Sequence, residues 1–215
     1  MILEFKGVTG QNKGFNLQDI TFSLEEGFVM GVIGRNGAGK TTLLRYIYDE
    51  DIKYTGEILF RGSNIQSLGK AVFNEIGVVS DDFSCFPGLS AMENAKLLSV
   101  FYSDWSQDRF TEMMREMQVP PSTPLANVSR GEWLKYQVCL AYAHNTRLYL
   151  MDEVTSGMDP VFRRDFFKFL HNLMLDESVG IIITDHNKEE VDIHMDYCLT
   201  IDKGRVESMA ETLPE

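Results

Sequence analysis

The sequence has few cysteines, fewer basic than acidic residues and no long apolar run. Its three cysteines, Cys85, Cys139 and Cys198, are widely spaced and form no Cys-x-x-Cys pair. This spacing indicates neither a disulfide framework nor a zinc knuckle, and it fits a protein of the reducing cytosol. Lys and Arg number 20 against 32 Asp and Glu, which gives a net charge of −12. Such a chain lacks the clustered positive charge that phosphate-backbone affinity requires, so no nucleic acid is expected as a partner.

No stretch of the sequence reaches the ~18 apolar residues that a membrane-spanning helix requires. The first residues, from Met1 to Lys6, also lack the charged and then apolar layout of a signal peptide. We therefore expect any action at a membrane to depend on another chain. The 215 residues are 44% apolar and 24% charged, which predicts a folded globular protein with one functional unit.

Strands and helices alternate along most of the chain, which predicts a parallel sheet with helices on its faces. The predicted strands are residues 2–8, 19–24, 28–33, a pair around 56–60 and 76–79, then 148–151, 180–184 and a terminal pair around 197–206. The predicted helices are residues 42–48, a helical stretch at 91–117, then 130–145 and 160–176. The prolines at 120, 121 and 124 mark a break, and the middle helices are expected to form a separate lobe.

The most specific motif is a glycine loop between a predicted strand and a predicted helix. Residues 34–41 read Gly-Arg-Asn-Gly-Ala-Gly-Lys-Thr and match the pattern of a phosphate-binding loop. Its glycines let backbone N–H groups point at phosphates, and the helix adds the positive end of its dipole. Lys40 would hold the β- and γ-phosphates, and the Thr41 hydroxyl would bind Mg²⁺. The predicted nucleotide contacts are Gly34, Asn36, Gly37, Ala38, Gly39, Lys40, Thr41 and Thr42.

Two carboxylates, Asp152 and Glu153, follow the apolar residues 148–151. Parallel α/β sheets present such strand ends at the ligand crevice. Asp152 is expected to support the Mg²⁺ shell, and Glu153 to polarise a water in line with the γ-phosphate. Without the phosphate loop, the pair would equally fit ordinary surface acids at the end of a strand.

A third motif begins at Ser129. Residues 128–132 read Val-Ser-Arg-Gly-Glu and open a predicted helix, so Ser129 is placed as an N-cap. Its hydroxyl and the following amides could bind a phosphate. By itself the segment is only a helix start, and its position between Lys40 and Asp152 is what gives it weight.

In this order of motifs, the chain resembles the ATP-binding cassette (ABC) ATPases from Met1 to about Val206. The family's signature motif, usually Leu-Ser-Gly-Gly-Gln, matches residues 128–132. The resemblance implies that Asp152 and Glu153 are the magnesium and catalytic acids, that Asp159 belongs to the D-loop and contacts nucleotide, and that His186 senses the γ-phosphate.

The resemblance implies an α/β fold with a P-loop NTPase core, an inserted α-helical subdomain and an N-terminal antiparallel β region. One ABC ATPase domain, 1–215, would divide into a core lobe of about 1–82 and 146–215 and a helical lobe of about 83–145. ATP and Mg²⁺ are the implied cofactors.

Family members form head-to-tail dimers with ATP between the lysine loop of one subunit and the signature residues, here Ser129 and Gly131, of the other. The expected partners are therefore a second ABC ATPase subunit, identical or related, and an integral-membrane permease. The expected location is the cytoplasmic face of the cell membrane. ATP would close the dimer because its γ-phosphate makes contacts only in the closed state.

The sequence departs from the family pattern at several positions. Asp81 occupies the place of a glutamine that contacts Mg²⁺ and the membrane subunit, and its carboxylate could reach a magnesium-bound water. The aromatic residue that stacks on adenine is missing from its usual place, which leaves Phe15 as the substitute. Arg130 and Glu132 replace a glycine and a glutamine of the signature motif. None of these changes removes a group essential to hydrolysis, so ATPase activity is expected.

Residues 77–83, Gly-Val-Val-Ser-Asp-Asp-Phe, resemble the exporter branch that includes ATPases of antibiotic-resistance and antimicrobial-peptide efflux systems. The sequence therefore predicts a subunit that hydrolyses ATP to export a peptide, lipid-like or drug-like substrate through a separately encoded permease. The alternative is a soluble ABC-type ATPase that acts in macromolecular or cluster assembly. A small-molecule or nucleotide kinase would need an acceptor pocket and would not explain Ser129, Gly131 or His186.

Overall fold

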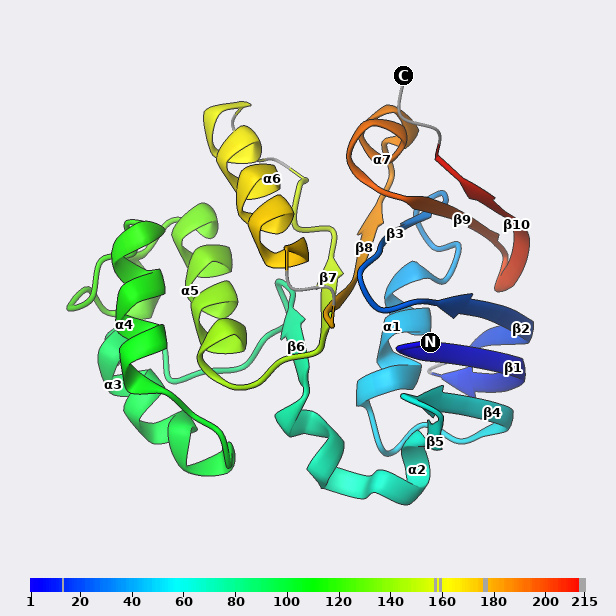
Figure 1. Ribbon diagram of the computed structural model, residues 1–215, viewed down its shortest axis with the longest axis horizontal. Coiled ribbons are helices and arrows are strands. Elements are labelled where there is room, and N and C mark those ends of the chain that lie inside the picture. The colour runs from blue at the N-terminus through cyan, green and yellow to red at the C-terminus, as the bar shows by residue number, and fades with distance from the viewer. Residues whose placement is uncertain (13, 157, 159, 176–177, 213–215) are drawn as a thin grey trace.

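The computed structural model describes residues 1–12, 14–156, 158, 160–175 and 178–212, and it contains two β-sheets and several helices (Figure 1). The first sheet is antiparallel and has the strand order β2-β1-β4-β5. Its strands are β1 (Leu3–Asn12), β2 (Phe15–Leu24), β4 (Tyr54–Phe60) and β5 (Ser63–Asn64). The predicted antiparallel region near the N-terminus is thereby confirmed.

The second sheet has the strand order β10-β9-β3-β8-β7-β6. Its strands are β3 (Val29–Ile33), β6 (Ile76–Val79), β7 (Leu148–Asp152), β8 (Gly180–Asp185), β9 (Tyr197–Asp202) and β10 (Arg205–Glu211). All neighbours in this sheet are parallel except β9 and β10. The predicted pairing of residues 56–60 with 76–79 is wrong, because β4 and β6 belong to different sheets.

The α-helices of the described residues are α1 (Lys40–Tyr48), α2 (Ile65–Leu68), α3 (Ala91–Leu98), α4 (Gln107–Glu116), α5 (Arg130–Ala143), α6 (Pro160–Met174) and α7 (Lys188–His194). The described residues also form the short 3₁₀ helices η1 (Gly69–Asn74), η2 (Ser99–Phe101) and η3 (Leu125–Asn127). Helices α3, α4 and α5 lie together on one side of the molecule (Figure 1), and we call them the helical group.

The predicted helical stretch 91–117 is confirmed, and the chain forms two α-helices there. Helix α3 passes into the short η2, and α4 begins anew after Ser106. The Ser106 side chain accepts a hydrogen bond from the Arg109 N–H, which is the arrangement of an N-cap. A polar cap inside the stretch therefore starts a second helix.

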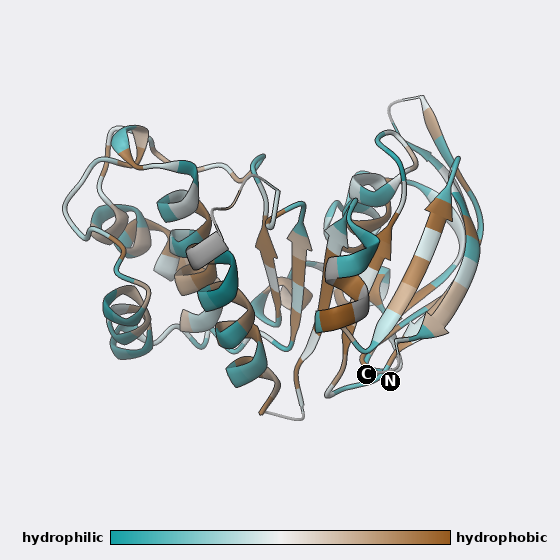
Figure 2. Cartoon of the chain, turned by 90° about the horizontal axis from the view of Figure 1, so that it is seen from above, coloured by the Kyte–Doolittle hydropathy of each residue, from teal (hydrophilic) through white to brown (hydrophobic). Residues whose placement is uncertain are grey.

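The central strands β3, β7 and β8 of the second sheet are buried on both faces, as parallel strands covered by other elements require. One face packs against the antiparallel sheet and α1, through residues such as Met30, Leu150 and Ile182. The other face packs against the helical group and α6, through residues such as Met151 and Ile183. Figure 2 shows these apolar strands between the helices and the antiparallel sheet. The predicted α/β architecture is confirmed.

The register of the second sheet brings three strand ends to one edge. Ile33 at the end of β3 lies opposite Asp185 of β8, and Asp152 of β7 lies opposite Thr184. The segments that follow β3, β7 and β8 therefore leave the sheet side by side, which is where parallel sheets bind ligands. Separately, no helix among the described residues is both long and apolar enough to cross a bilayer.

Candidate functional site

The glycine loop between β3 and α1 has the backbone that its sequence predicts. Gly37 and Gly39 have φ values of +79° and +113°, which L residues rarely adopt. A Cβ atom on Gly34 would lie 2.3 Å from the Ile201 carbonyl oxygen, so only glycine fits at this position. Residues 35–37 are exposed, and the first turn of α1 contains no acidic residue. No acidic side chain in the first turn of α1 therefore neutralises the positive end of the helix dipole.

Lys40 is the first residue of α1, and its side chain is only 4% exposed. Its Nζ donates to the Gly34 carbonyl at 2.9 Å and lies 3.2 Å from Oε1 of Glu153. The structure thus brings together the lysine of the first motif and the second acid of the next one. Thr41 and Thr42 follow in the first turn of α1 and are half-buried.

The two acids at the end of β7 share one buried hydroxyl. Thr184 Oγ1 donates to Asp152 Oδ1 at 2.6 Å and accepts from the Glu153 N–H at 2.9 Å. Thr184 is fully buried, so these hydrogen bonds fix the Asp152 carboxylate and the backbone of Glu153. The sequence analysis missed Thr184, although a polar residue near the end of the apolar strand β8 was a usable signal.

His186 follows β8 at the same edge of the sheet, and its turn is held by Asp185. The buried Asp185 carboxylate accepts from the backbone N–H of His186 at 2.6 Å and of Asn187 at 2.8 Å. Oδ2 of the same carboxylate accepts a hydrogen bond from the Thr155 hydroxyl. The His186 side chain is 58% exposed, and its role as a γ-phosphate sensor stays a prediction.

Ser129 is the N-cap of α5, as predicted. Its hydroxyl accepts from the Glu132 N–H, and the Glu132 carboxylate accepts from the Ser129 N–H at 2.7 Å and from its hydroxyl at 2.8 Å. These hydrogen bonds lower the pKa of Glu132 below its ordinary value. A Cβ atom on Gly131 would lie 3.5 Å from the Phe162 ring. Contact of Ser129 and Gly131 with phosphate stays a prediction that requires a second subunit.

Asp81 pairs with Arg130, the residue that replaces a signature glycine. The Arg130 Nη2 lies 2.9 Å from Oδ2 of Asp81. The predicted contact of Asp81 with Mg²⁺ stays a prediction, and this ion pair competes with it. Thr41 and Asp152 supply a hydroxyl and a carboxylate oxygen, which fit the preference of Mg²⁺ for oxygen ligands. The predicted contact residue Asp159 lies outside the described residues.

Phe15, the predicted adenine-stacking residue, lies against the phosphate loop. Its Cε1 is 2.6 Å from the place where a Cβ on Gly39 would stand. Phe15 is half-buried at the start of β2, beside Gly39. This position is compatible with stacking on a base, which stays a prediction.

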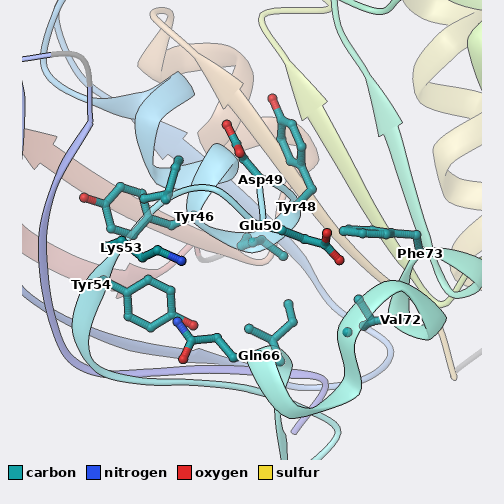
Figure 3. A pocket seen from close by; sticks show the side chains of 13 residues that line it. Tyr46, Tyr48, Asp49, Glu50, Lys53, Tyr54, Gln66, Val72 and Phe73 are labelled. Atoms are coloured by element: carbon teal, nitrogen blue, oxygen red, sulfur yellow. The ribbon is translucent and has the colours of Figure 1, made fainter.

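A cavity of about 490 Å³ lies at the opposite end of α1 and is separate from this site (Figure 3). It is lined by residues between the end of α1 and η1, among them Tyr48, Glu50, Tyr54 and Phe73. None of its lining residues was predicted to bind nucleotide or metal. The candidate site is therefore the edge where Lys40, Asp152 and Glu153 meet.

Comparisons with known proteins agree with this geometry. Residues 17–156 match the family model described as ABC transporter. The ABC transporter ATP-binding protein YtrB of Bacillus subtilis (strain 168) is 29% identical over 177 residues, which are 82% of this chain and 60% of YtrB. The methionine import ATP-binding protein MetN of Corynebacterium efficiens is 30% identical over 95% of this chain and 61% of MetN. The bacitracin transport ATP-binding protein BcrA of Bacillus licheniformis is 23% identical over 89% of this chain and 63% of BcrA.

The chain thus spans about 60% of the length of these curated relatives. Among solved structures, the dimeric bacterial ABC transporter cassette MJ0796 superposes with a TM-score of 0.86 at 20% identity, over 99% of this chain and 100% of that one. This likeness shows the fold, which is that of the ABC ATPases. The family match covers more than half of the chain and includes the phosphate loop, the capped signature helix and the acids after β7, so the chain belongs to the ABC transporter family as an ATP-binding domain.

Proposed function

We propose that the chain binds and hydrolyses ATP as the nucleotide-binding subunit of an ABC transporter. The observation that carries the proposal is the buried Lys40, whose ammonium lies between the glycine loop and the Glu153 carboxylate. A phosphate seated on the loop would contact Lys40 and the N-terminus of α1. Glu153 stands beside that position and would orient the attacking water.

The remaining residues have supporting roles in this proposal. Thr41 and Asp152 would hold Mg²⁺, which neutralises charge that develops on the phosphates. Thr184 fixes the Asp152 carboxylate and the backbone of Glu153 through its hydroxyl. His186 would contact the γ-phosphate from the end of β8. In a head-to-tail dimer, Ser129, Gly131 and Asp159 would complete the site of the partner subunit.

For the transport reaction, we propose export of a peptide, lipid-like or drug-like substrate through a separately encoded permease. The resemblance of residues 77–83 to efflux ATPases supports export, as does the similarity to the bacitracin transport protein BcrA. The similarity to the methionine import protein MetN points the other way. A position at the cytoplasmic face of the membrane follows from the proposed permease.

The hydrolysis proposal is tested with Glu153→Gln, which keeps the shape of the side chain and removes its charge. We expect ATP binding to remain and the hydrolysis rate to fall by at least about 10²-fold, since a general base is lost. Glu75→Gln is the matched control, because Glu75 lies between η1 and β6 and pairs with Arg61, in the turn between β4 and β5. Near-normal turnover in Glu153→Gln would remove Glu153 from its proposed role.

The transport proposal is tested by purification of the tagged chain from its native membranes in mild detergent. A polytopic membrane protein that co-purifies would support the transporter, and a second ABC ATPase with it would indicate a heterodimer. Recovery from the soluble fraction alone, with soluble partners, would instead favour the assembly ATPase. The direction of transport then requires substrate flux in vesicles that contain both proteins.

A further inference from the structure

Asp81 and Arg130, two residues that depart from the family pattern, contact each other in a specific geometry. Nε of Arg130 lies 3.0 and 3.1 Å from the two carboxylate oxygens of Asp81, while Nη2 lies 2.9 Å from Oδ2. The same guanidinium donates from Nη2 to the Glu153 carbonyl at 3.2 Å and from Nη1 to the Ser156 carbonyl. One side chain therefore connects the start of α5, the segment after β6 and the turn after β7.

Arg130 contacts the turn of residues 153–156, which sets the backbone conformation of Glu153. Glu153 has a φ of +50°, in the left-handed region that is costly for a residue with a side chain. The Ser156 N–H donates to the Glu153 carbonyl at 3.2 Å and closes the turn. Arg130 bonds the carbonyls of the first and last residues of this turn. Its contacts thus hold a conformation that the backbone alone does not favour.

Asp81 accounts for the direction of the guanidinium. A carboxylate that engages Nε and Nη2 fixes the plane of the guanidinium and leaves N–H groups of both Nη atoms to reach the carbonyls. Asp81 is itself tied to α5, because the preceding Ser80 donates its backbone N–H to Oε1 of Gln137 at 2.8 Å. Ser80 and Gln137 are both buried, so the spacing between α5 and Asp81 is fixed.

We propose that Arg130 is a positioning residue for Glu153, and that Asp81 acts by orienting Arg130. The inference rests on the proposed role of Glu153 in ATP hydrolysis. It explains why the two departures occur in one chain: an acid after β6 and an arginine in the signature form one unit. A glycine at position 130 would have no side chain to reach the turn, and a lysine would have no planar fork to contact three segments.

The kinetic test compares Arg130→Ala, Arg130→Lys, Asp81→Ala and the double alanine variant. We expect kcat for ATP hydrolysis to fall by about 10- to 100-fold in both Arg130 variants, since small displacements of a reacting group have effects of this size. The dissociation constant for ATP should stay within about twofold, because the hydrogen bonds of Arg130 go to Asp81 and to the turn after β7. Asp82→Ala is the matched control, because Asp82 pairs with Arg45 at 2.7 Å.

The double variant separates an orienting role from an independent one. If Asp81 acts through Arg130, the double alanine variant should have the same kcat as Arg130→Ala. Effects that multiply would overturn the orienting role of Asp81. A wild-type kcat in Arg130→Ala would overturn the role of Arg130. The melting temperature should change little in these variants, since exposed ion pairs contribute little to stability.

Hydrogen exchange tests the same inference without hydrolysis. The amide of Ser156 donates within the turn, so its protection should fall in Arg130→Ala and Arg130→Lys and remain in Asp82→Ala. A wild-type chain that does not hydrolyse ATP would contradict the proposed function, while loss of protection would still support the positioning role. Unchanged protection at residues 153–156 in both Arg130 variants would overturn it.

Discussion

Burial of His144 should make the stability of this protein depend on pH between about 6.5 and 4. His144 is 2% exposed at the end of α5, and its ring stacks on Tyr102 with centroids 4.1 Å apart. Burial lowers its pKa from 6.5 to about 4, partly offset by the hydrogen bond from Nδ1 to the Asn74 carbonyl, while the charge of Arg109 lowers it further. The neutral ring is therefore the form that the folded protein accepts.

The sign and size of the effect follow from proton linkage. Below pH 6.5 the unfolded chain binds a proton on His144 that the folded protein does not bind until about pH 4. The contribution of neutral His144 to the free energy of unfolding is therefore fully present above pH 6.5. It is lost as the pH falls from about 6.5 to about 4. Between pH 7 and pH 5, this single group should remove about 2 kcal/mol from the free energy of unfolding.

The assay is urea denaturation of the wild-type chain and of His144→Gln at both pH values. Glutamine can still donate to the Asn74 carbonyl but does not titrate, so the variant should lose about 2 kcal/mol less than the wild type on acidification. The comparison removes the contribution of the many carboxylates, which both proteins share. Equal losses in the two proteins would refute the argument that His144 is held neutral.

Three further predictions concern the site and its surroundings. Thr184→Val removes the hydroxyl that bonds Asp152 and Glu153, so kcat should fall and the free energy of unfolding should decrease by about 1–3 kcal/mol. Thr55 is exposed, and Thr55→Val is the control in the ATPase and urea assays. Gly39→Ala places a Cβ 2.6 Å from Phe15 at a φ of +113°, so calorimetry should show weaker ATP binding. The control is Gly62→Ala, at a φ of +78° with no atom within 4 Å, which should keep wild-type affinity. Ser90→Ala removes the N-cap of α3, so the free energy of unfolding should decrease by about 1 kcal/mol. The kcat/KM for ATP should be unchanged.

Each of these predictions has an outcome that contradicts it. Unaltered kcat in Thr184→Val would mean that the hydroxyl does not orient the acids. Wild-type ATP affinity in Gly39→Ala would show that the loop accommodates a side chain despite its backbone. A loss of turnover in Ser90→Ala that matches its loss of stability would indicate that α3 contributes to the site.

The sequence by itself determined the features that depend on neighbouring residues. The glycine loop needs positive φ angles at Gly37 and Gly39, and only glycine adopts them without strain, so the pattern alone identified it. Ser129 was identifiable as an N-cap because the capping residue and its partner Glu132 are three positions apart. Asp152 and Glu153 could be assigned because they lie at the end of an apolar strand, and Lys40 because it follows the glycine loop.

Only the tertiary structure decided which distant residues meet. Thr184 reaches Asp152 across 32 positions, and Arg130 reaches Asp81 across 49, because the strand order puts β7 between β6 and β8. The same long-range order placed β4 and β6 in different sheets, although the sequence analysis gave them as a strand pair. Local patterns carry no information on sheet order, since that order depends on how the apolar faces of the whole chain are buried together. The sequence therefore predicted the glycine loop and the two acids as one site, while the fold determined what holds those acids in place.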